Sequence, residues 1–244
     1  MVGETTRGEN GSAHKLSIIM PVYNEAPTLR TVFDVVRQVP LPLPREIILI
    51  DDGSRDGSAA IVDELASTYA DDNVYALHHP VNCGKGAGIR TALAAASGTI
   101  VLIQDADLEY NPHNYTALLS PILEGRTTIV FGSRAWFSHT AFSFWFVMGN
   151  KLVTLVTNIL FNSYISDVET CYKVLPTSVA RSLELESRGF EIEVEITAKL
   201  LRAGHRIYEV PVDYTARTRA EGKKLYWQDG LRAIRALIRY RLRR

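Results

Sequence analysis

The sequence predicts an α/β fold in which a mostly parallel, twisted sheet is flanked by helices. Short apolar runs alternate with stretches of helical periodicity as far as residue 133, and the chain shows no internal repeat. Continuous apolar strands separated by helices are typical of a parallel sheet that is covered on both faces. A chain of 244 residues is also long enough to bury a sizeable core.

The elements alternate in a regular order along this part of the chain. Strands are expected at 15–22, 46–51, 74–79, 99–104 and 128–133, and helices at 28–39, 58–70, 85–97 and 113–124. The longest apolar segment, 141–165, is interrupted by Asn150, Lys151, Asn158 and Asn162. These residues favour one or two amphipathic helices over a membrane span.

The two ends of the chain differ in composition from the rest. Residues 1–14 are polar and Gly-rich, which predicts a disordered lead-in. Residues 226–244 predict a basic amphipathic helix, with leucines and isoleucines beside a stripe of arginines. Two interpretations of this helix stay open. It packs on the domain with a solvated basic face, or it lies on an anionic membrane surface.

Overall charge bears on the kind of binding partner, and cysteine content bears on the redox compartment. Lys and Arg balance Asp and Glu at 27 each, so the total charge does not indicate a nucleic-acid partner. Two cysteines and no signal peptide favour a reducing cytoplasm.

Polar residues gather where the predicted strands end. They are Asn24 and Glu25, the run 51–54, the pair Asp105 and Asp107, and Arg134. The run Asp-Asp-Gly-Ser-Arg-Asp-Gly is also what a turn and a helix N-cap would need. Because active sites of such sheets lie at the carboxyl ends of the strands, the gathering at one edge indicates a functional site.

The sequence Gln-Asp-Ala-Asp-Leu-Glu-Tyr after the fourth strand suggests a metal site. Residues i and i+2 of an extended chain point the same way, so Asp105 and Asp107 converge if the extension continues. Two close carboxylates repel unless a cation neutralises them. Oxygen ligands suit Mg²⁺ or Mn²⁺, which commonly also hold substrate phosphates, and Glu109 is a candidate third ligand.

Several spaced motifs resemble the family 2 glycosyltransferases, which have the GT-A fold and an Asp-x-Asp metal motif. The motifs are MPVYNE (20–25), IDDGS (50–54), QDADLEY (104–110) and FGSR (131–134). Later blocks are similar to the dolichol-phosphate mannose synthase branch of polyprenyl-phosphate sugar synthases. They are SDVETCYKV (166–174), GFEIEVEITAKLLRAGHRIYEVPVDY (189–214) and RTRAEGKK (217–224).

The resemblance implies a GT-A catalytic domain at 15–225, with a Rossmann-like nucleotide-binding half and an acceptor-binding half. It implies nucleotide-sugar contacts at Pro21, Tyr23, Glu25, Asp52, Asp105 and Ala106, and metal ligands at Asp105, Asp107 and Glu109. Catalytic roles follow for Asp107, Arg134, Arg217, Lys223 and Glu195. Glu109 stands where the mannose synthases often have Gln, so it keeps an oxygen ligand but adds a charge.

The implied reaction is an inverting, metal-dependent transfer of a sugar to a polyprenyl or dolichyl phosphate. The acceptor is a phosphate monoester with a second pKa of about 6, so it arrives ionised and needs no strong general base. GDP-mannose is the favoured donor, followed by UDP-glucose and then UDP-N-acetylglucosamine. A lipid-linked acceptor implies peripheral binding to the cytoplasmic face of a membrane, alone or with a separate membrane protein.

Other interpretations have to be weighed against this one. A dinucleotide-dependent oxidoreductase would need G-x-G-x-x-G after the first strand, and the chain lacks it. A catalytically inactive, membrane-associated nucleotide-sugar-binding protein stays open, although the intact Asp105 and Asp107 disfavour it. The alternating Glu191, Glu193 and Glu195 favour one solvated edge of a strand or helix. Gly84-Lys85-Gly86 lacks the P-loop spacing and favours a turn into a helix.

Overall fold

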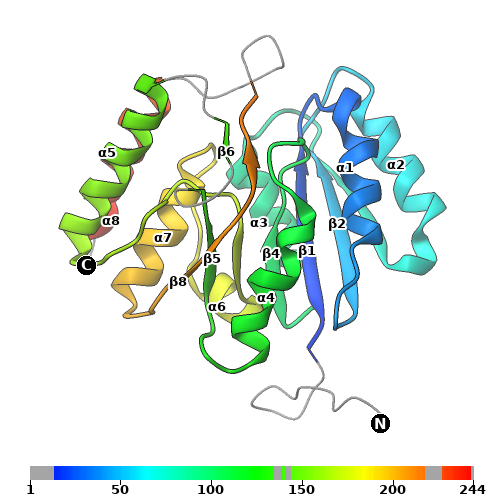
Figure 1. Cartoon of the computed structure of the whole chain (residues 1–244). Coiled ribbons are helices and arrows are strands. Elements are labelled where there is room, and N and C mark those ends of the chain that lie inside the picture. The colour runs from blue at the N-terminus through cyan, green and yellow to red at the C-terminus, as the bar shows by residue number, and fades with distance from the viewer. Residues whose placement is uncertain (1–13, 135–138, 141–143, 218–226, 243–244) are drawn as a thin grey trace.

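A seven-stranded sheet forms the centre of the molecule (Figure 1). The computed structural model describes residues 14–134, 139–140, 144–217 and 227–242. The strand order is β3-β2-β1-β4-β7-β5-β8. β7 runs antiparallel to its neighbours β4 and β5, and the other paired strands of this sheet are parallel. The predicted α/β class with a mostly parallel sheet is confirmed.

The elements predicted from periodicity are present, with ends shifted by a few residues. The strands are β1 (Leu16–Val22), β2 (Arg45–Asp51), β3 (Val74–His78), β4 (Ile100–Ile103) and β5 (Val130–Ser133). The helices between them are α1 (Ala26–Gln38), α2 (Ser58–Thr68), α3 (Lys85–Ala95) and α4 (Tyr115–Leu123), with short 3-10 turns at Ala70–Asp72 and Pro112–Asn114.

The described part of the second half of the chain holds four more strands and four more helices. The strands are β6 (His139–Thr140), β7 (Lys173–Pro176), β8 (Tyr208–Pro211) and β9 (Tyr214–Thr215), and β6 pairs with β9 in a separate small sheet. The helices are α5 (Phe144–Phe161), α6 (Thr177–Ser182), α7 (Ile192–Arg202) and α8 (Trp227–Leu242). β6 and β9 have two residues each, too few to produce a readable period.

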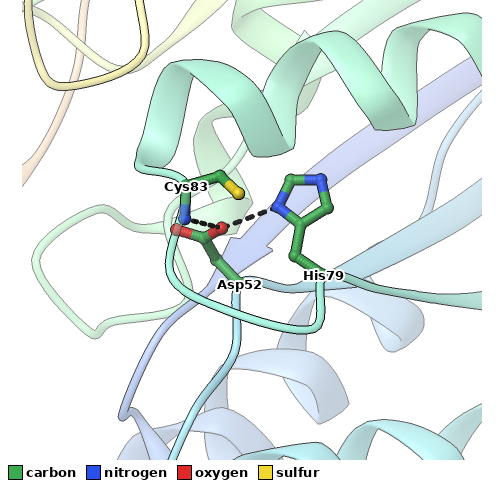
Figure 2. Close-up of side chains that lie close together, drawn as sticks. All are labelled: Asp52, His79 and Cys83. Atoms are coloured by element: carbon green, nitrogen blue, oxygen red, sulfur yellow. Dashed lines mark hydrogen bonds and ion pairs between the residues drawn. The ribbon is translucent and has the colours of Figure 1, made fainter.

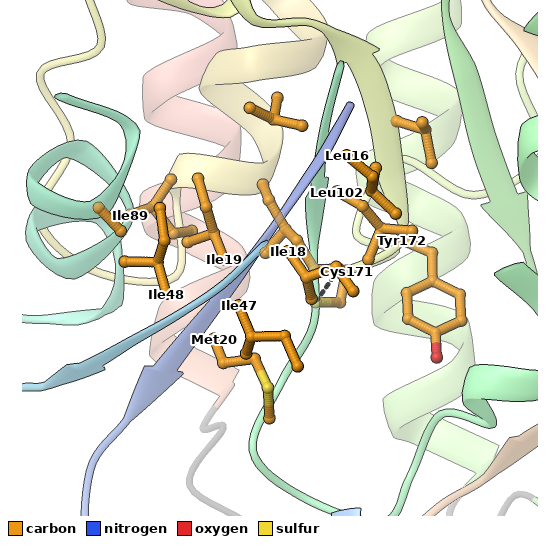
Figure 3. Close-up of a cluster of buried hydrophobic side chains, with 14 of the residues drawn as sticks. Leu16, Ile18, Ile19, Met20, Ile47, Ile48, Ile89, Leu102, Cys171 and Tyr172 are labelled. Carbon is orange, nitrogen blue, oxygen red and sulfur yellow. Dashed lines mark hydrogen bonds between the residues drawn. The ribbon is translucent and has the colours of Figure 1, made fainter. Parts of the chain in front are cut away.

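The main core lies on both faces of the central strands (Figure 3). Consecutive residues of β1, such as Ile18 and Ile19, are both fully buried because α1 and α2 lie on one face of the sheet and α3 lies on the other (Figure 1). This double cover explains why the central strands are apolar at nearly every position. It also leaves the strand ends as the place where polar side chains can gather.

A second core holds α8 against α5 and α7. Val153 of α5 and Val194 of α7 pack there with Ala233, Leu237 and Tyr240 of α8. The C-terminal helix is therefore packed on the domain along one face. Within the described residues, no helix combines the length and the apolarity needed to cross a membrane.

Glu46 on β2 ties together three segments at the amino-terminal edge of the sheet. Its carboxylate accepts hydrogen bonds from Ser17 Oγ (2.6 Å), Ser97 N (2.6 Å) and Lys15 Nζ (2.7 Å). Burial acts to raise the pKa of Glu46, but the hydrogen bonds from Lys15, Ser17 and Ser97 outweigh it and lower the pKa from 4.5 to about 2.

Glu46→Gln is expected to lower the free energy of unfolding at pH 7 by about 2 kcal/mol, because the charged hydrogen bonds are lost. A carboxylate with a depressed pKa stabilises the fold above its unfolded pKa and loses this effect as the pH falls through the folded pKa. The difference between wild type and variant should therefore shrink between pH 4.5 and about pH 2. Urea unfolding across this range measures it. The exposed Glu64→Gln, which breaks a surface pair with Arg30, is the control. A difference that does not change with pH would contradict the assignment.

Candidate active site

One cavity of about 370 Å³ opens at the carboxyl ends of β1, β2, β4 and β5. Most residues that the sequence predicted for the site line it: Pro21, Tyr23, Glu25, Asp52, Asp105, Ala106, Asp107, Glu109, Arg134 and Arg217. Glu195 is not among the lining residues, and Lys223 lies outside the described residues. The edge of the sheet thus brings together side chains that are far apart in the sequence.

The loops after β1 and β2 hold each other in place through hydrogen bonds. Asn24 N donates to Ser54 Oγ (3.0 Å), and Arg55 N donates to Asn24 Oδ1 (2.8 Å). Asp56 accepts from Ser58 N (3.0 Å) and from Ala26 N (3.0 Å), so it serves the first turns of both α2 and α1. The run forms a turn in which Gly57, without a side-chain cap, occupies the N-cap position of α2, and the Asp56 contacts fix the wall of the cavity.

Asp52 fixes the turn that leads into α3 (Figure 2). Its carboxylate accepts from His79 Nδ1 (2.7 Å), Cys83 N (2.8 Å) and Gly84 N (2.7 Å). The potential ligand atoms of Asp52, His79 and Cys83 lie within 4.8 Å of one another, a spacing that a metal ion would also fit. Because three donors already engage the Asp52 oxygens, we interpret the cluster as a structural turn.

Carboxylates from two loops surround the guanidinium of Arg217. Arg217 Nη2 lies 2.7 Å from Asp107 Oδ2, and Nη1 lies 3.0 Å from Glu25 Oε2. Glu109 holds the same segment, because Oε1 accepts from Arg217 N (2.8 Å) and Oε2 accepts from Tyr214 Oη (2.8 Å). Both oxygens of the predicted third metal ligand are therefore engaged by residues 214–217.

The charges around Asp107 are incompletely balanced. Burial, with repulsion from Asp105 and Glu109, raises the pKa of Asp107 to about 7, although Arg217 acts in the opposite direction. Such a cluster of carboxylate oxygens fits the preferences of Mg²⁺ or Mn²⁺, because a divalent cation would relieve the repulsion. Asp105 and Asp107 therefore stay the predicted ligands of such an ion.

Glu193 and two lysines form a buried charged network beside Asp105. Lys85 Nζ lies 2.6 Å from Asp105 Oδ1 and 2.9 Å from Glu193 Oε1. Lys173, which is fully buried, bridges to Glu193 Oε2 (2.6 Å) and donates to the carbonyls of Val168 and Thr170. Lys85 thereby serves as a counter-ion for Asp105. Sequence reasoning assigned no role to Glu193 or Lys173.

The prediction that Glu191, Glu193 and Glu195 form one solvated edge is wrong. Glu193 and Glu195 are buried on α7 because the helix packs under the cavity and against α8. Glu195 accepts from the backbone N–H groups of Glu186 (2.8 Å) and Ser187 (2.7 Å) and pairs with Lys199 (2.7 Å). These contacts hold the loop before α7, and the structure does not bring Glu195 into the cavity.

The Gly-Lys-Gly turn packs against the same loop. Gly86 N donates to the carbonyl of Arg188 (2.7 Å), and Gly84 has a positive φ of 94°. A Cβ at Gly84 would overlap the Arg188 carbonyl. The glycines therefore permit a close backbone contact, and α3 begins at Lys85 as the predicted turn into a helix requires.

Arg134 lines the cavity and is held by Asp167. It makes two parallel bonds to Asp167, Nε to Oδ2 (2.6 Å) and Nη2 to Oδ1 (2.7 Å), and it lies 5.0 Å from the centre of the Tyr214 ring. When the Asn150 amide is turned so that its oxygen faces Arg134, this oxygen accepts a hydrogen bond from Arg134 Nη2 (2.7 Å). The amide nitrogen then donates a hydrogen bond to Glu169 Oε2 (3.2 Å). Burial raises the pKa of Glu169 to about 7, against the effect of Arg134.

Two helices reach the border of the cavity. Asn150 of α5 and Asp229 and Ala233 of α8 belong to its lining. These helices lie side by side at one end of the molecule (Figure 1). A ligand in the cavity would therefore lie next to α5 and α8, a relation that the sequence pattern did not reveal.

The family model for glycosyl transferase family 2 matches residues 17–181. An undecaprenyl-phosphate 4-deoxy-4-formamido-L-arabinose transferase of Proteus mirabilis is 32% identical over 152 residues, which cover 59% of this chain and 44% of the relative. A dolichyl-phosphate beta-glucosyltransferase, ALG5A, of Trichomonas vaginalis is 32% identical over 131 residues, which cover 49% of this chain and 40% of the relative. The chain thus spans less than half the length of these relatives. Their names agree with the branch that the motifs predicted.

Solved structures show the same fold at low sequence identity. The glucosyl-3-phosphoglycerate synthase of Mycobacterium tuberculosis, solved with Mn²⁺, UDP and phosphoglyceric acid, has a TM-score of 0.70 at 20% identity, over 94% of this chain and 79% of that one. TarS 1–349 of S. aureus, solved with UDP-GlcNAc, has a TM-score of 0.62 at 18% identity, over 92% of this chain and 66% of that one. The GT-A class predicted from the motifs is confirmed.

Glu193→Gln is expected to lower the free energy of unfolding by about 3–5 kcal/mol, because it leaves the ammonium of Lys173 buried without its carboxylate partner. Chemical denaturation measures the loss. The matched control is Glu191→Gln on the same turn, where the side chain is half-buried and accepts from Gly189 N. An equal loss of unfolding free energy in the two variants would show that the ion pair between Lys173 and Glu193 stabilises the fold no more than the Glu191 hydrogen bond does.

Proposed function

Because the chain belongs to glycosyl transferase family 2, we propose that it transfers a sugar from a nucleotide sugar to a polyprenyl phosphate. The observation that carries the proposal is the composition of one cavity. It combines the carboxylates of Asp105 and Asp107, the arginines Arg134 and Arg217, and a border formed by α5 and α8. The names of the relatives support a polyprenyl-phosphate acceptor.

The carboxylates form the donor side of the proposed site. Asp105 and Asp107 would hold Mg²⁺ or Mn²⁺, and the ion would supply Lewis-acid stabilisation of the departing nucleoside diphosphate. Lys85 keeps Asp105 in place through its ion pair. Pro21, Tyr23 and Asp52 line the side of the cavity where the loops after β1 and β2 would enclose the nucleoside.

The arginines form the acceptor side. An oxygen of the acceptor phosphate bonds to the anomeric carbon, while the bond from that carbon to the diphosphate oxygen breaks and its electron pair leaves with the diphosphate. Attack opposite the leaving group inverts the anomeric configuration. Arg134 and Arg217, with Lys223 from outside the described residues, pair with the acceptor phosphate. No general base is required, since the attacking oxygen is already ionised.

The proposal also concerns the identity of the sugar that is transferred. The sequence motifs place GDP-mannose first and UDP-glucose and UDP-N-acetylglucosamine after it. Neither relative described above is named as a mannosyltransferase, and one is named for a glucosyl transfer. The three donors therefore have to be compared directly.

The helices α5 and α8 form the proposed membrane side. α5 exposes Trp145, Leu155 and Ile159 at helical spacing, and their exposed fractions are 81%, 55% and 71%. α8 exposes Leu231, Ile238 and Leu242 on the face opposite its buried residues, with exposed arginines beside them. An apolar strip flanked by cations suits a bilayer that contains anionic lipid. We therefore place the protein peripherally on the cytoplasmic face of a membrane, alone or with a membrane protein.

The decisive experiment is a transfer assay with a short polyprenyl phosphate, read by mass spectrometry. Each of the three donors is tested with Mg²⁺, Mn²⁺ or EDTA. The expected result is one glycolipid product whose formation EDTA abolishes. Absence of product from every donor, while a nucleotide sugar still binds, would favour the catalytically inactive binding protein instead.

Asp107→Ala is expected to lower the rate of transfer by at least about 100-fold, because the charge that develops on the departing diphosphate loses its stabilisation. The same assay measures it, and Asp63→Ala, an exposed acid on α2, is the control. A wild-type rate in Asp107→Ala would disprove the metal assignment.

Leu155→Glu combined with Ile159→Glu is expected to weaken binding to vesicles of phosphatidylcholine and phosphatidylserine by about tenfold or more, because two apolar side chains no longer enter the bilayer. Co-sedimentation measures the binding. Tyr75→Glu, which replaces an exposed aromatic residue on β3 at the other end of the sheet, is the control. Equal vesicle binding by all three proteins would rule out this surface.

A further inference from the structure

Arg217 binds Asp107, one of the two carboxylates that the proposed metal would need. Its Nη2 contacts Asp107 Oδ2 (2.7 Å), and its two terminal nitrogens contact both oxygens of Glu25 (3.0 and 3.3 Å). The Arg217 side chain is only 16% exposed, so the guanidinium lies inside the cluster. The pairs link residues 110 and 192 positions apart in the sequence, and the fold alone brings them together.

A guanidinium and a divalent cation beside the same carboxylates repel each other, so each weakens the binding of the other. The guanidinium carries one positive charge and neutralises one carboxylate, whereas the ion would neutralise two. We propose that Arg217 is an internal counter-ion that competes with the divalent cation for Asp107, and that metal binding transfers the Arg217 side chain from the carboxylates to the acceptor phosphate. This inference rests on the proposed function.

The backbone around Arg217 is held so that the side chain can exchange partners without moving its segment. Arg217 N donates to Glu109 Oε1 (2.8 Å) and Thr215 N donates to the Glu109 carbonyl (2.8 Å). The Tyr214 hydroxyl donates a hydrogen bond to Glu109 Oε2 (2.8 Å), and the backbone of Tyr214 forms an isolated β-bridge with Tyr110. Glu109 is therefore a positioning residue: it anchors the backbone of Arg217 beside Asp107.

This exchange of partners by Arg217 would determine the order in which the ligands bind. While Arg217 pairs with Asp107 and Glu25, its guanidinium is not available to a second anion. If a divalent cation neutralises the carboxylates, rotation of the Arg217 side chain would supply a cation for the acceptor phosphate. Metal binding would therefore precede productive acceptor binding.

The test is the affinity of the full chain for Mn²⁺ in the absence of any nucleotide, measured from the electron paramagnetic resonance signal of free Mn²⁺. Arg217→Gln, which removes the competing charge, is expected to bind Mn²⁺ about tenfold more tightly than wild type. Arg217→Lys, which keeps the charge, should stay near wild type. Arg30→Gln, which breaks a bidentate pair with Glu64 on the surface, is the matched control.

Two further arms separate this inference from the proposed function. If Asp107→Asn loses Mn²⁺ binding but Arg217→Gln binds as wild type does, the metal site stands and the competition is disproved. If no protein binds Mn²⁺, with or without GDP or UDP, the metal assignment fails and the competition with it.

A second measurement follows the Arg217 side chain in the wild type directly. NMR of ¹⁵N-arginine-labelled protein should show one guanidinium signal change its environment when Mg²⁺ and the nucleoside diphosphate are added, and that signal should be absent from Arg217→Lys. An Arg217 signal unchanged at saturating Mg²⁺ would overturn the inference.

Discussion

Repulsion among the carboxylates at the end of β4 is the constraint on which the site depends. Asp105, Asp107 and Glu109 follow one buried strand, and each is held by a different partner: Lys85, Arg217 and the backbone of residues 214–217. Without these partners the negative charges would be buried uncompensated at the edge of the core. The same partners come from α3 and from the segment after β9, so charge compensation also fixes how the two halves of the domain meet.

Much of the fold could be predicted from the sequence, and so could the positions of the acidic residues of the site. Strands buried on both faces are continuously apolar, so β1, β2 and β4 were visible, and their ends located Glu25, Asp52 and Asp105. The period-2 spacing of Asp105 and Asp107 indicated a cation. The sequence does not show which basic side chain pairs with which carboxylate, because Lys85, Lys173 and Glu193 meet only after the chain has folded.

The failures have physical causes as well. Glu193 and Glu195 looked like a solvated edge because alternating acids usually are, yet α7 buries them against lysines. β7 runs antiparallel to β4 and β5, and an apolar run carries no signal of the direction of its strand. The relation of α5 and α8 to the cavity depends on packing between helices distant in sequence. It connects an apolar exposed surface with a polar site, as the proposed lipid-linked phosphate acceptor would require.

The most direct measurement is anomalous diffraction from crystals of the full chain grown with Mn²⁺ and GDP or UDP. The expected map has a manganese peak at the oxygens of Asp105 and Asp107, with the Arg217 guanidinium no longer paired to Asp107. A peak at Asp52, His79 and Cys83 instead, or no peak at Asp107 with its Arg217 pair intact, would contradict a metal-dependent site at the end of β4.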